Sequence, residues 1–166
     1  MPDKETMERA KKDKRQGKAA STQAGEFVRE EFEHIREGKH GARSTKQAIA
    51  IGLSKARRAG VDLRPPKKGA VSEKTRHSAQ NAYHAGQQGE HPTSRTRARA
   101  ASRALEREPK AARSHAAVAK QARSAAAKHT SSERSAAARK AARTKGPTAR
   151  SAAARKAANT RAAHRA

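Results

Sequence analysis

The sequence contains no cysteine and no long apolar run. Without cysteine the chain can form neither a disulfide framework nor a thiolate metal site. No stretch approaches the roughly 18 consecutive apolar residues of a membrane span, and residues 1–18 lack the apolar centre of a signal peptide. We therefore expect a soluble, cytoplasmic protein that does not associate with membranes.

Large hydrophobic residues are also scarce. Alanine supplies most of the 33% hydrophobic content, and the larger apolar side chains concentrate between Phe27 and Leu63. Elsewhere the chain has too little apolar surface to offset the roughly 1–2 kcal/mol of backbone entropy lost for each ordered residue. The sequence predicts one small packed nucleus in this region.

Acidic residues are few relative to basic ones. The 166 residues include 40 Lys and Arg against 15 Asp and Glu, a formal net charge of +25. Residues 92–166 contain twenty basic and three acidic residues, which give +17 of that charge. Such an imbalance indicates a polyanionic partner, and +17 is well beyond the charge that solubility needs. Nucleic acid is the expected partner.

Aromatic residues are limited to Phe27, Phe32 and Tyr83. Recognition of single strands and RNA loops relies on bases stacking on aromatic rings, and both phenylalanines are expected in the packed nucleus. The composition therefore favours DNA over RNA, although arginine can also stack on bases. An RNA-binding or ribosome-associated protein remains the main alternative.

The groups that catalysis and metal binding require are also rare. The chain has three aspartates and no glycine-rich phosphate loop, so we expect no enzyme, no catalytic residues and no cofactor. His77, His84 and His91 are seven residues apart, whereas neighbouring metal ligands on a helix are usually about one turn apart. We expect no metal site.

Residues 21–61 have the pattern of a helical hairpin. Apolar residues recur at helical spacing over residues 22–37 and 45–59, and a glycine follows each segment as a stop signal. Ser44 and Gln47 form a capping-box pattern at the start of the second helix. A short connection between two amphipathic helices predicts that they fold back on each other.

Two residues depart from this pattern. Glu31 falls within the apolar arc of the first helix, where an unpaired carboxylate would be costly, so we expect it to have a basic partner. Ile51 projects away from Ile49 and Leu53. It is either an exposed residue or a contact with a third helix or a second subunit, and a homodimer through the hairpin is therefore possible.

The predicted fold class is all-α, with the hairpin followed by isolated helices. A basic N-terminal arm over 1–20 precedes the hairpin, and a proline-containing linker over 62–71 follows it. A weak helix and a hinge are expected over 72–91, with Gly86 ending the helix. Residues 92–166 form a low-complexity basic tail in which RSAAARKAA occurs twice. Alanine favours helix, but like charges oppose it, so we predict that the tail is largely disordered or conditionally helical.

The predicted nucleic-acid contacts are basic residues of the second hairpin helix and of the tail. At the start of that helix a phosphate could meet free backbone amides. The predicted residues are Arg43, Lys46, Lys55, Arg57, Arg58, Arg95, Arg97, Arg99, Arg103, Arg113, Lys120, Arg123, Arg134, Arg139, Lys140, Arg143, Lys145, Arg150, Arg155, Lys156, Arg161 and Arg165.

The segment from Ser21 to Val61, and above all KHGARSTKQAIAIGLSKARRAG over Lys39 to Gly60, resembles an uncharacterised bacterial family of small basic proteins described only as DNA-binding. The resemblance implies a bacterial, cytoplasmic setting and carries over no catalytic residues. The tail is similar in composition to the tails of linker histones and bacterial histone-like proteins.

Together these features predict a non-enzymatic, largely sequence-independent DNA-binding protein of nucleoid-associated type that acts by neutralising phosphates. A second alternative is an adaptor whose hairpin binds a protein partner while the tail localises it.

Overall fold

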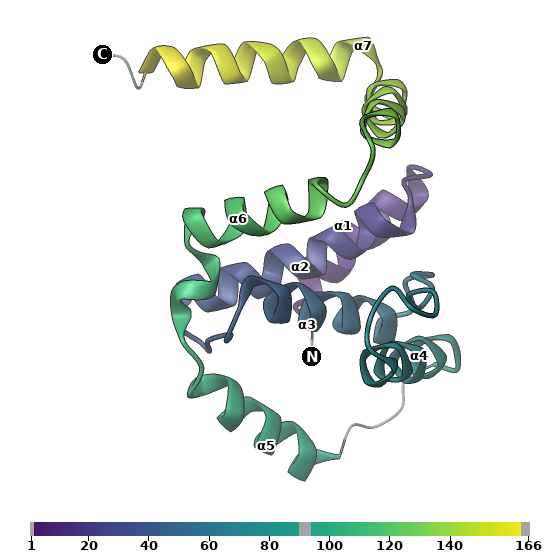
Figure 1. Cartoon of the computed structure of the whole chain (residues 1–166), viewed down its shortest axis with the longest axis vertical. Helices are drawn as coiled ribbons and strands as arrows, with labels where there is room; N and C mark the ends of the chain where they lie inside the picture. The colour runs from purple at the N-terminus through teal and green to yellow at the C-terminus, as the bar shows by residue number, and fades with distance from the viewer. Residues whose placement is uncertain (1, 90–93, 164–166) are drawn as a thin grey trace. The chain divides into compact units, whose positions relative to one another are not determined.

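A computed structural model describes residues 2–89 and 94–163, and all regular structure in these ranges is helical (Figure 1). This confirms the all-α prediction. The chain forms two compact units, Met1–Gln121 and Ala122–Ala166. The elements are α1 (Lys4–Arg15), α2 (Ala20–Glu37), α3 (Thr45–Arg58), α4 (Glu73–Gln87), α5 (Arg95–Glu106), the 3-10 helix η1 (Lys110–Arg113), α6 (His115–Ala126) and α7 (Ser131–Ala163).

The predicted hairpin is present as α2 and α3, which pack against each other. Phe27 of α2 is completely buried, and Leu53 of α3 packs against its cluster. At the crossing Gly52 lies so close to α2 that a Cβ there would come within 2.6 Å of the Cα of Val28. Glycine at this position lets the two backbones approach, and a larger residue would push the helices apart.

The ends of the hairpin helices follow the sequence signals. Ser44 caps α3 by accepting a hydrogen bond from the Gln47 amide at 3.2 Å. At the other end the Val61 amide donates to the Ala56 carbonyl at 3.1 Å, and the Gly60 amide donates to the Arg57 carbonyl at 3.0 Å. These two bonds form a Schellman motif. They turn the buried Val61 into the core.

The N-terminal segment is not a simple basic arm, because residues 4–15 form helix α1 and pack on α2. Ala10 is buried, and Met7 packs against the cluster that contains Phe27. Arg9 joins the two helices by donating to Glu26 with an Nε–Oε2 distance of 2.7 Å. Apolar contacts of Met7 and Ala10, the Arg9–Glu26 ion pair and contacts of Asp3 with Glu30 and His34 join this segment to the acidic helix.

Helix α4 packs on α3 and continues past the predicted stop at Gly86. Ser72 caps its start, as the Thr75 amide donates to the serine hydroxyl. A Cβ on Gly86 would lie 1.8 Å from the carbonyl oxygen of Arg57. Gly86 is therefore the point of contact between α4 and α3 and does not end the helix, which corrects the prediction.

The compact unit extends to Gln121, well past residue 92, where the tail was predicted to begin. The loop after α2 binds this later segment through its backbone: the Gly41 amide donates to Leu105, and the Ala42 amide donates to Pro109 at 2.9 Å. Ala112 of η1 is buried beside Ile35 and Ala42. Part of the predicted tail therefore belongs to the folded unit.

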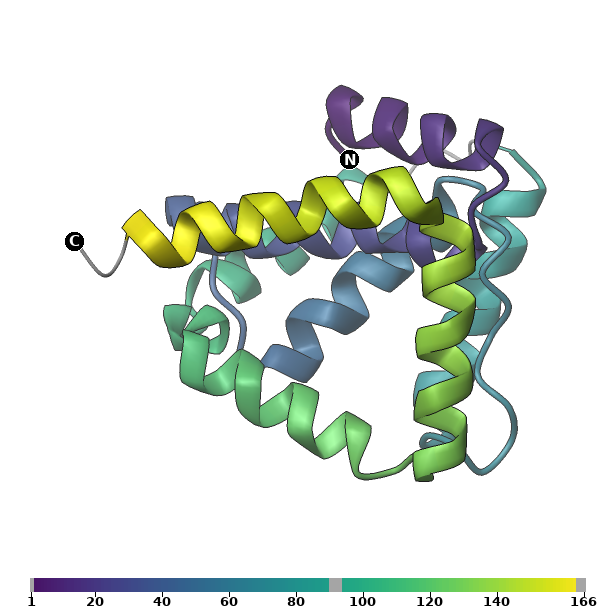
Figure 2. The ribbon, with the colours of Figure 1, turned by 90° about the horizontal axis from the view of Figure 1, so that it is seen from above.

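The rest of the tail is helical in the described residues, so the prediction of a largely disordered tail is not upheld. Figure 2 shows α7 as a long helix that changes direction, and at this point Gly146 has φ 70° and ψ 170°, directly before Pro147. Glu133 caps the start by accepting from the Thr130 amide at 2.7 Å. No described residue of α7 is buried, so alanine propensity and capping rather than packing account for the helix.

Candidate nucleic-acid interface

The cations of α5, α6 and α7 lack carboxylate partners. Within residues 94–163, no ion pair involves a lysine or an arginine, and the one pair in this stretch joins His129 to Glu133. In residues 2–89 six lysines and arginines pair with carboxylates, namely Arg9, Lys18, Arg29, Lys39, Lys55 and Arg76. Positive charge in the later helices is therefore not neutralised by the protein's own described side chains.

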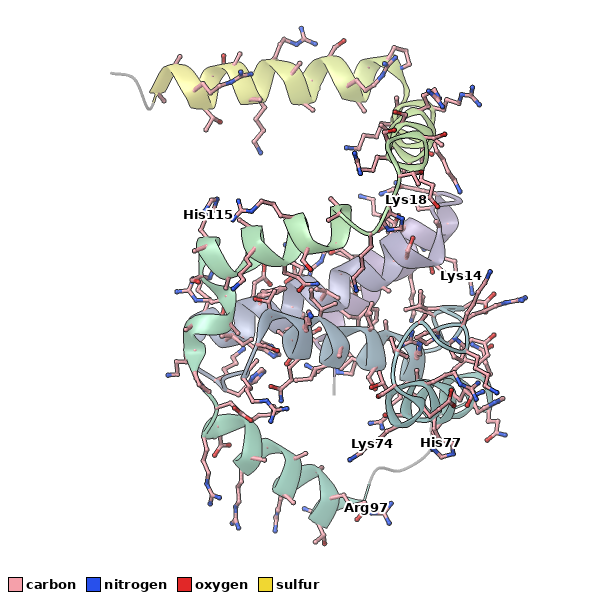
Figure 3. All side chains as sticks on the ribbon, viewed as in Figure 1. Lys14, Lys18, Lys74, His77, Arg97 and His115 are labelled. Carbon is pink, nitrogen blue, oxygen red and sulfur yellow. The ribbon has the colours of Figure 1, made fainter. Side chains whose placement is uncertain are left out.

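Helix α5 presents a line of arginines. Arg95, Arg99 and Arg103 follow one another at four-residue intervals and are exposed. Each interval advances the helix by about 6 Å and turns it by about 40°, so the three guanidinium groups stay on one face. Figure 3 labels Arg97, which also reaches into solvent from this helix.

Helix α7 has a different charge distribution. The two copies of RSAAARKAA fall on either side of the break at Gly146, in Arg134–Ala142 and Arg150–Ala158. Within a copy, the arginine at its start, the next arginine and the adjacent lysine are about 100–140° apart around the helix axis. The helix is therefore basic on all sides and could contact phosphates in more than one orientation.

The described tail residues of the predicted set are all exposed. They are Arg95, Arg97, Arg99, Arg103, Arg113, Lys120, Arg123, Arg134, Arg139, Lys140, Arg143, Lys145, Arg150, Arg155, Lys156 and Arg161. Arg165 lies outside the described residues. Two compact units carry these cations, and the unit boundary falls between Lys120 and Arg123.

On the hairpin only part of the predicted set is free to contact a ligand. Arg43, Lys46 and Arg58 are exposed. Arg57 is 7% exposed and donates from Nε to the Leu63 carbonyl at 3.0 Å, and its burial lowers its pKa. Arg57 holds the chain after α3, and Lys55 faces buried carboxylates. We correct the prediction for both residues.

The start of α3 is also less open to a phosphate than the sequence suggested. The Gln47 amide is already bound by Ser44, and the Arg43 amide donates to Oε1 of Gln47 at 2.7 Å. The Thr45 hydroxyl donates to the Ala112 carbonyl. Local caps and the docked η1 segment therefore use part of the polar groups of this helix end.

The three aromatic side chains are already used within the fold. Phe27 is fully buried, and Phe32 packs against the cluster that contains Ile35. The hydroxyl of Tyr83 donates to Asp62 at 2.7 Å, and this hydrogen bond raises the pKa of Tyr83. Phe27 therefore offers no ring on which bases could stack, and part of the Phe32 ring is covered.

A group of buried charges lies between α2 and α3. Glu30 and Glu31 are 2% and 0% exposed, and Nζ of Lys55 lies 3.2 Å from Oε1 of Glu30 and 2.8 Å from Oε2 of Glu31. Burial alone would lower the pKa of Lys55, but the two carboxylates outweigh it and the pKa is raised. The prediction of a basic partner for Glu31 is confirmed.

The histidines are distributed differently from the predicted series. His77 and His84 lie on α4, and His91 is outside the described residues. Two other histidines, His34 and His40, lie beside Glu31 at the end of α2. In the sequence His34 follows Glu31 by one helical turn, which indicates that the two share a face, but His40 reaches them only through the turn at Gly38.

No family model, curated protein or solved structure matches this chain. None of the described helices combines the length and apolar character that crossing a membrane requires.

Proposed function

We propose that this protein binds nucleic acid, with a preference for duplex DNA, through phosphate contacts that are largely independent of sequence. The observation that carries the proposal is the absence of carboxylate partners for the described cations of α5, α6 and α7. Phosphates would take the place of those partners and release counterions. Such a protein would coat or compact DNA in the cytoplasm as a nucleoid-associated, non-enzymatic component.

The state of the aromatic side chains supports the preference for duplex. Sequence-tolerant binding of single strands depends on rings that stack on bases, whereas Phe27 is buried in the core and Phe32 is partly buried against it. Binding of a duplex needs only cations directed at its backbone, which the exposed arginines of α5 and α7 supply. The RNA-binding alternative would require arginine alone to provide the stacking.

A salt titration of affinity for a labelled duplex tests the proposal. If about ten cations each neutralise one phosphate, the slope of log K against log salt should be about −9. A chain ending at His129 should bind with a less steep slope, because it keeps α1 to α6 and loses the cations of α7. Affinity that does not change with salt, or an unchanged slope after truncation, would contradict the proposal.

A charge-matched pair of variants separates specific placement from net charge. Both variants replace four cations by glutamine: Arg139, Lys140, Arg155 and Lys156 of α7 in one, and Lys11, Lys12, Lys14 and Arg15 of α1 in the other. The α7 variant should make the slope less steep by about 3–4, since each lost phosphate contact removes about 0.9 from its magnitude. The α1 variant should retain most of it. Equal losses would mean that only net charge matters.

Two further measurements address the nucleic-acid type and the oligomeric state. Competition between duplex DNA and structured RNA at one ionic strength should favour the duplex, and a preference for RNA would reverse the assignment.

Bridging of two duplexes would require two binding surfaces, which a homodimer through the hairpin near the partly buried Ile51 would provide. Light scattering after size exclusion measures whether that dimer forms.

A further inference from the structure

Glu31, His34 and His40 converge at the C-terminal end of α2. Glu31 and His34 are separated by one helical turn, and Gly38 then adopts a left-handed conformation that turns the chain so that His40 comes back toward them. One nitrogen or oxygen donor from each of the three residues lies within 4.8 Å of the other two. The two imidazole rings are 5.9 Å apart and nearly perpendicular.

The hydrogen bonding of His40 directs one ring nitrogen at the carboxylate. Its Nδ1 lies 3.0 Å from the Gly41 carbonyl, which can only accept, so Nδ1 carries the proton. Its Nε2 lies 3.0 Å from Oε1 of Glu31. A neutral ring therefore directs a lone pair at a carboxylate oxygen, and this arrangement needs a cation between them. Either a second proton on the ring or a metal ion satisfies it.

Glu31 is also short of partners. Its side chain is 0% exposed, and neither oxygen accepts a hydrogen bond of acceptable geometry from the described residues. Lys55 is within ion-pair distance of Oε2, but it faces Glu30 as well. Among the described residues, the one ion-pair partner of Oε1 is the ring of His40. One carboxylate oxygen is thus matched by the ammonium group and the other remains available to a ligand.

The balance of charges around these residues also favours a bound cation. Asp3 lies 3.2 Å from Nε2 of His34, and its backbone amide donates to Glu30. Asp3, Glu30 and Glu31 together carry three negative charges against the single positive charge of Lys55. The side chain of Asp3 is 57% exposed, so the buried part of the cluster is Glu30 and Glu31 against Lys55. With neutral imidazoles this buried part keeps one net negative charge, and the carboxylate of Asp3 adds a second at its edge. A divalent cation would balance both.

We propose that Glu31, His34 and His40 form a binding site for Zn²⁺. Two imidazole nitrogens and one carboxylate oxygen are ligands that zinc commonly takes in proteins. Tetrahedral bonds of about 2.0–2.1 Å place two donors roughly 3.3 Å apart, close to the 3.0 Å between Nε2 of His40 and Oε1 of Glu31. Asp3 contacts Nε2 of His34, so Nδ1 of His34 would bind the zinc while the carboxylate of Asp3 orients the ring.

Bound zinc would join the end of α2, the following loop and, through Asp3, the start of α1. The site is separate from the tail cations and does not depend on the proposed binding of nucleic acid. Calorimetric titration of the untagged full chain with Zn²⁺ should show one saturable site. Co²⁺ in its place should give the visible absorption of a tetrahedral complex.

Matched variants identify the ligands. His40→Ala should weaken Zn²⁺ binding by at least about tenfold, whereas His84→Ala on α4 should leave it unchanged. Circular dichroism of each variant checks that the helices remain. If His40→Ala does not fold, NMR of the unaltered chain decides, because Zn²⁺ should shift the imidazole signals of His34 and His40 and leave those of His77 and His84 in place.

Three results would overturn the proposal: no saturable binding in the unaltered chain, Zn²⁺ affinity that His40→Ala leaves unchanged, or binding that His84→Ala abolishes. Any of them would leave the three residues as a buried ion-pair cluster in which a proton on His40 balances Glu31.

Discussion

Replacing Lys55 by methionine tests the physical account of the charges between α2 and α3. Methionine keeps most of the aliphatic stem and removes the ammonium group that Glu30 and Glu31 share. Both carboxylates would then be buried without their main cation. The experiment is run with a chelator present, so that only the protein's own charges act.

The expected loss of stability follows from the burial of the three groups. Removing one partner of a buried ion pair costs about 3–5 kcal/mol, because the remaining charge is left uncompensated. Lys55 is 24% exposed, so water screens part of the interaction, and we expect a loss near the lower end, about 3 kcal/mol. For a folded unit of this size, that corresponds to a fall in melting temperature of roughly 10–20 °C.

Chemical denaturation followed by circular dichroism measures the loss, with Lys46→Met as the matched control. Lys46 lies on the same helix but is exposed, so its replacement should change stability by less than about 0.5 kcal/mol. Adding Glu31→Gln to Lys55→Met should recover part of the loss, since it removes one of the stranded charges. A loss below about 1 kcal/mol for Lys55→Met would refute the account.

Two further predictions concern α4. Gly86→Ala should destabilise the protein by about 1–3 kcal/mol, because the new Cβ would lie 1.8 Å from the carbonyl oxygen of Arg57. Gly25 faces open space within α2, so Gly25→Ala should be neutral or stabilising. Denaturation midpoints of the two variants test this difference. Tyr83 is the only tyrosine, and the hydrogen bond to Asp62 raises its pKa from 10.0. Its tyrosinate absorbance should therefore appear at higher pH than in the unfolded chain, and Asp62→Ala should move the midpoint back toward 10.0. The stabilising contribution of this hydrogen bond is present below pH 10 and is lost as the pH rises through the raised pKa of Tyr83. An unchanged midpoint of tyrosinate formation in Asp62→Ala would contradict the role of Asp62.

Local signals in the sequence predicted the hairpin well. The apolar spacing of α2 and α3, the cap at Ser44 and the stop at Gly60 each act within a few residues, so the sequence alone is enough to predict them. The same kind of local signal predicted a helix stop at Gly86. The glycine instead allows α4 to contact the backbone of α3 at Arg57, and the adjacent sequence does not indicate this contact.

The candidate interface was only partly predictable. Exposure of the tail cations follows from the lack of apolar residues around them. The buried positions of Lys55 and Arg57 do not, because a basic side chain on an amphipathic helix usually faces solvent. Glu31 within the apolar arc was the one sequence signal of a buried charge, and it indicated a partner without identifying Lys55.

The amino-acid sequence by itself determined the helical class, the hairpin and the concentration of unneutralised positive charge toward the C-terminus, since composition and short-range patterns set all three. Tertiary structure decided which distant groups meet. It placed α1 on α2 and brought His40 back beside Glu31. It also joined the Gly41 amide to the Leu105 carbonyl by a backbone hydrogen bond, which side-chain patterns in the sequence cannot predict. These contacts depend on the packing of whole helices, so they appear only once the chain has folded.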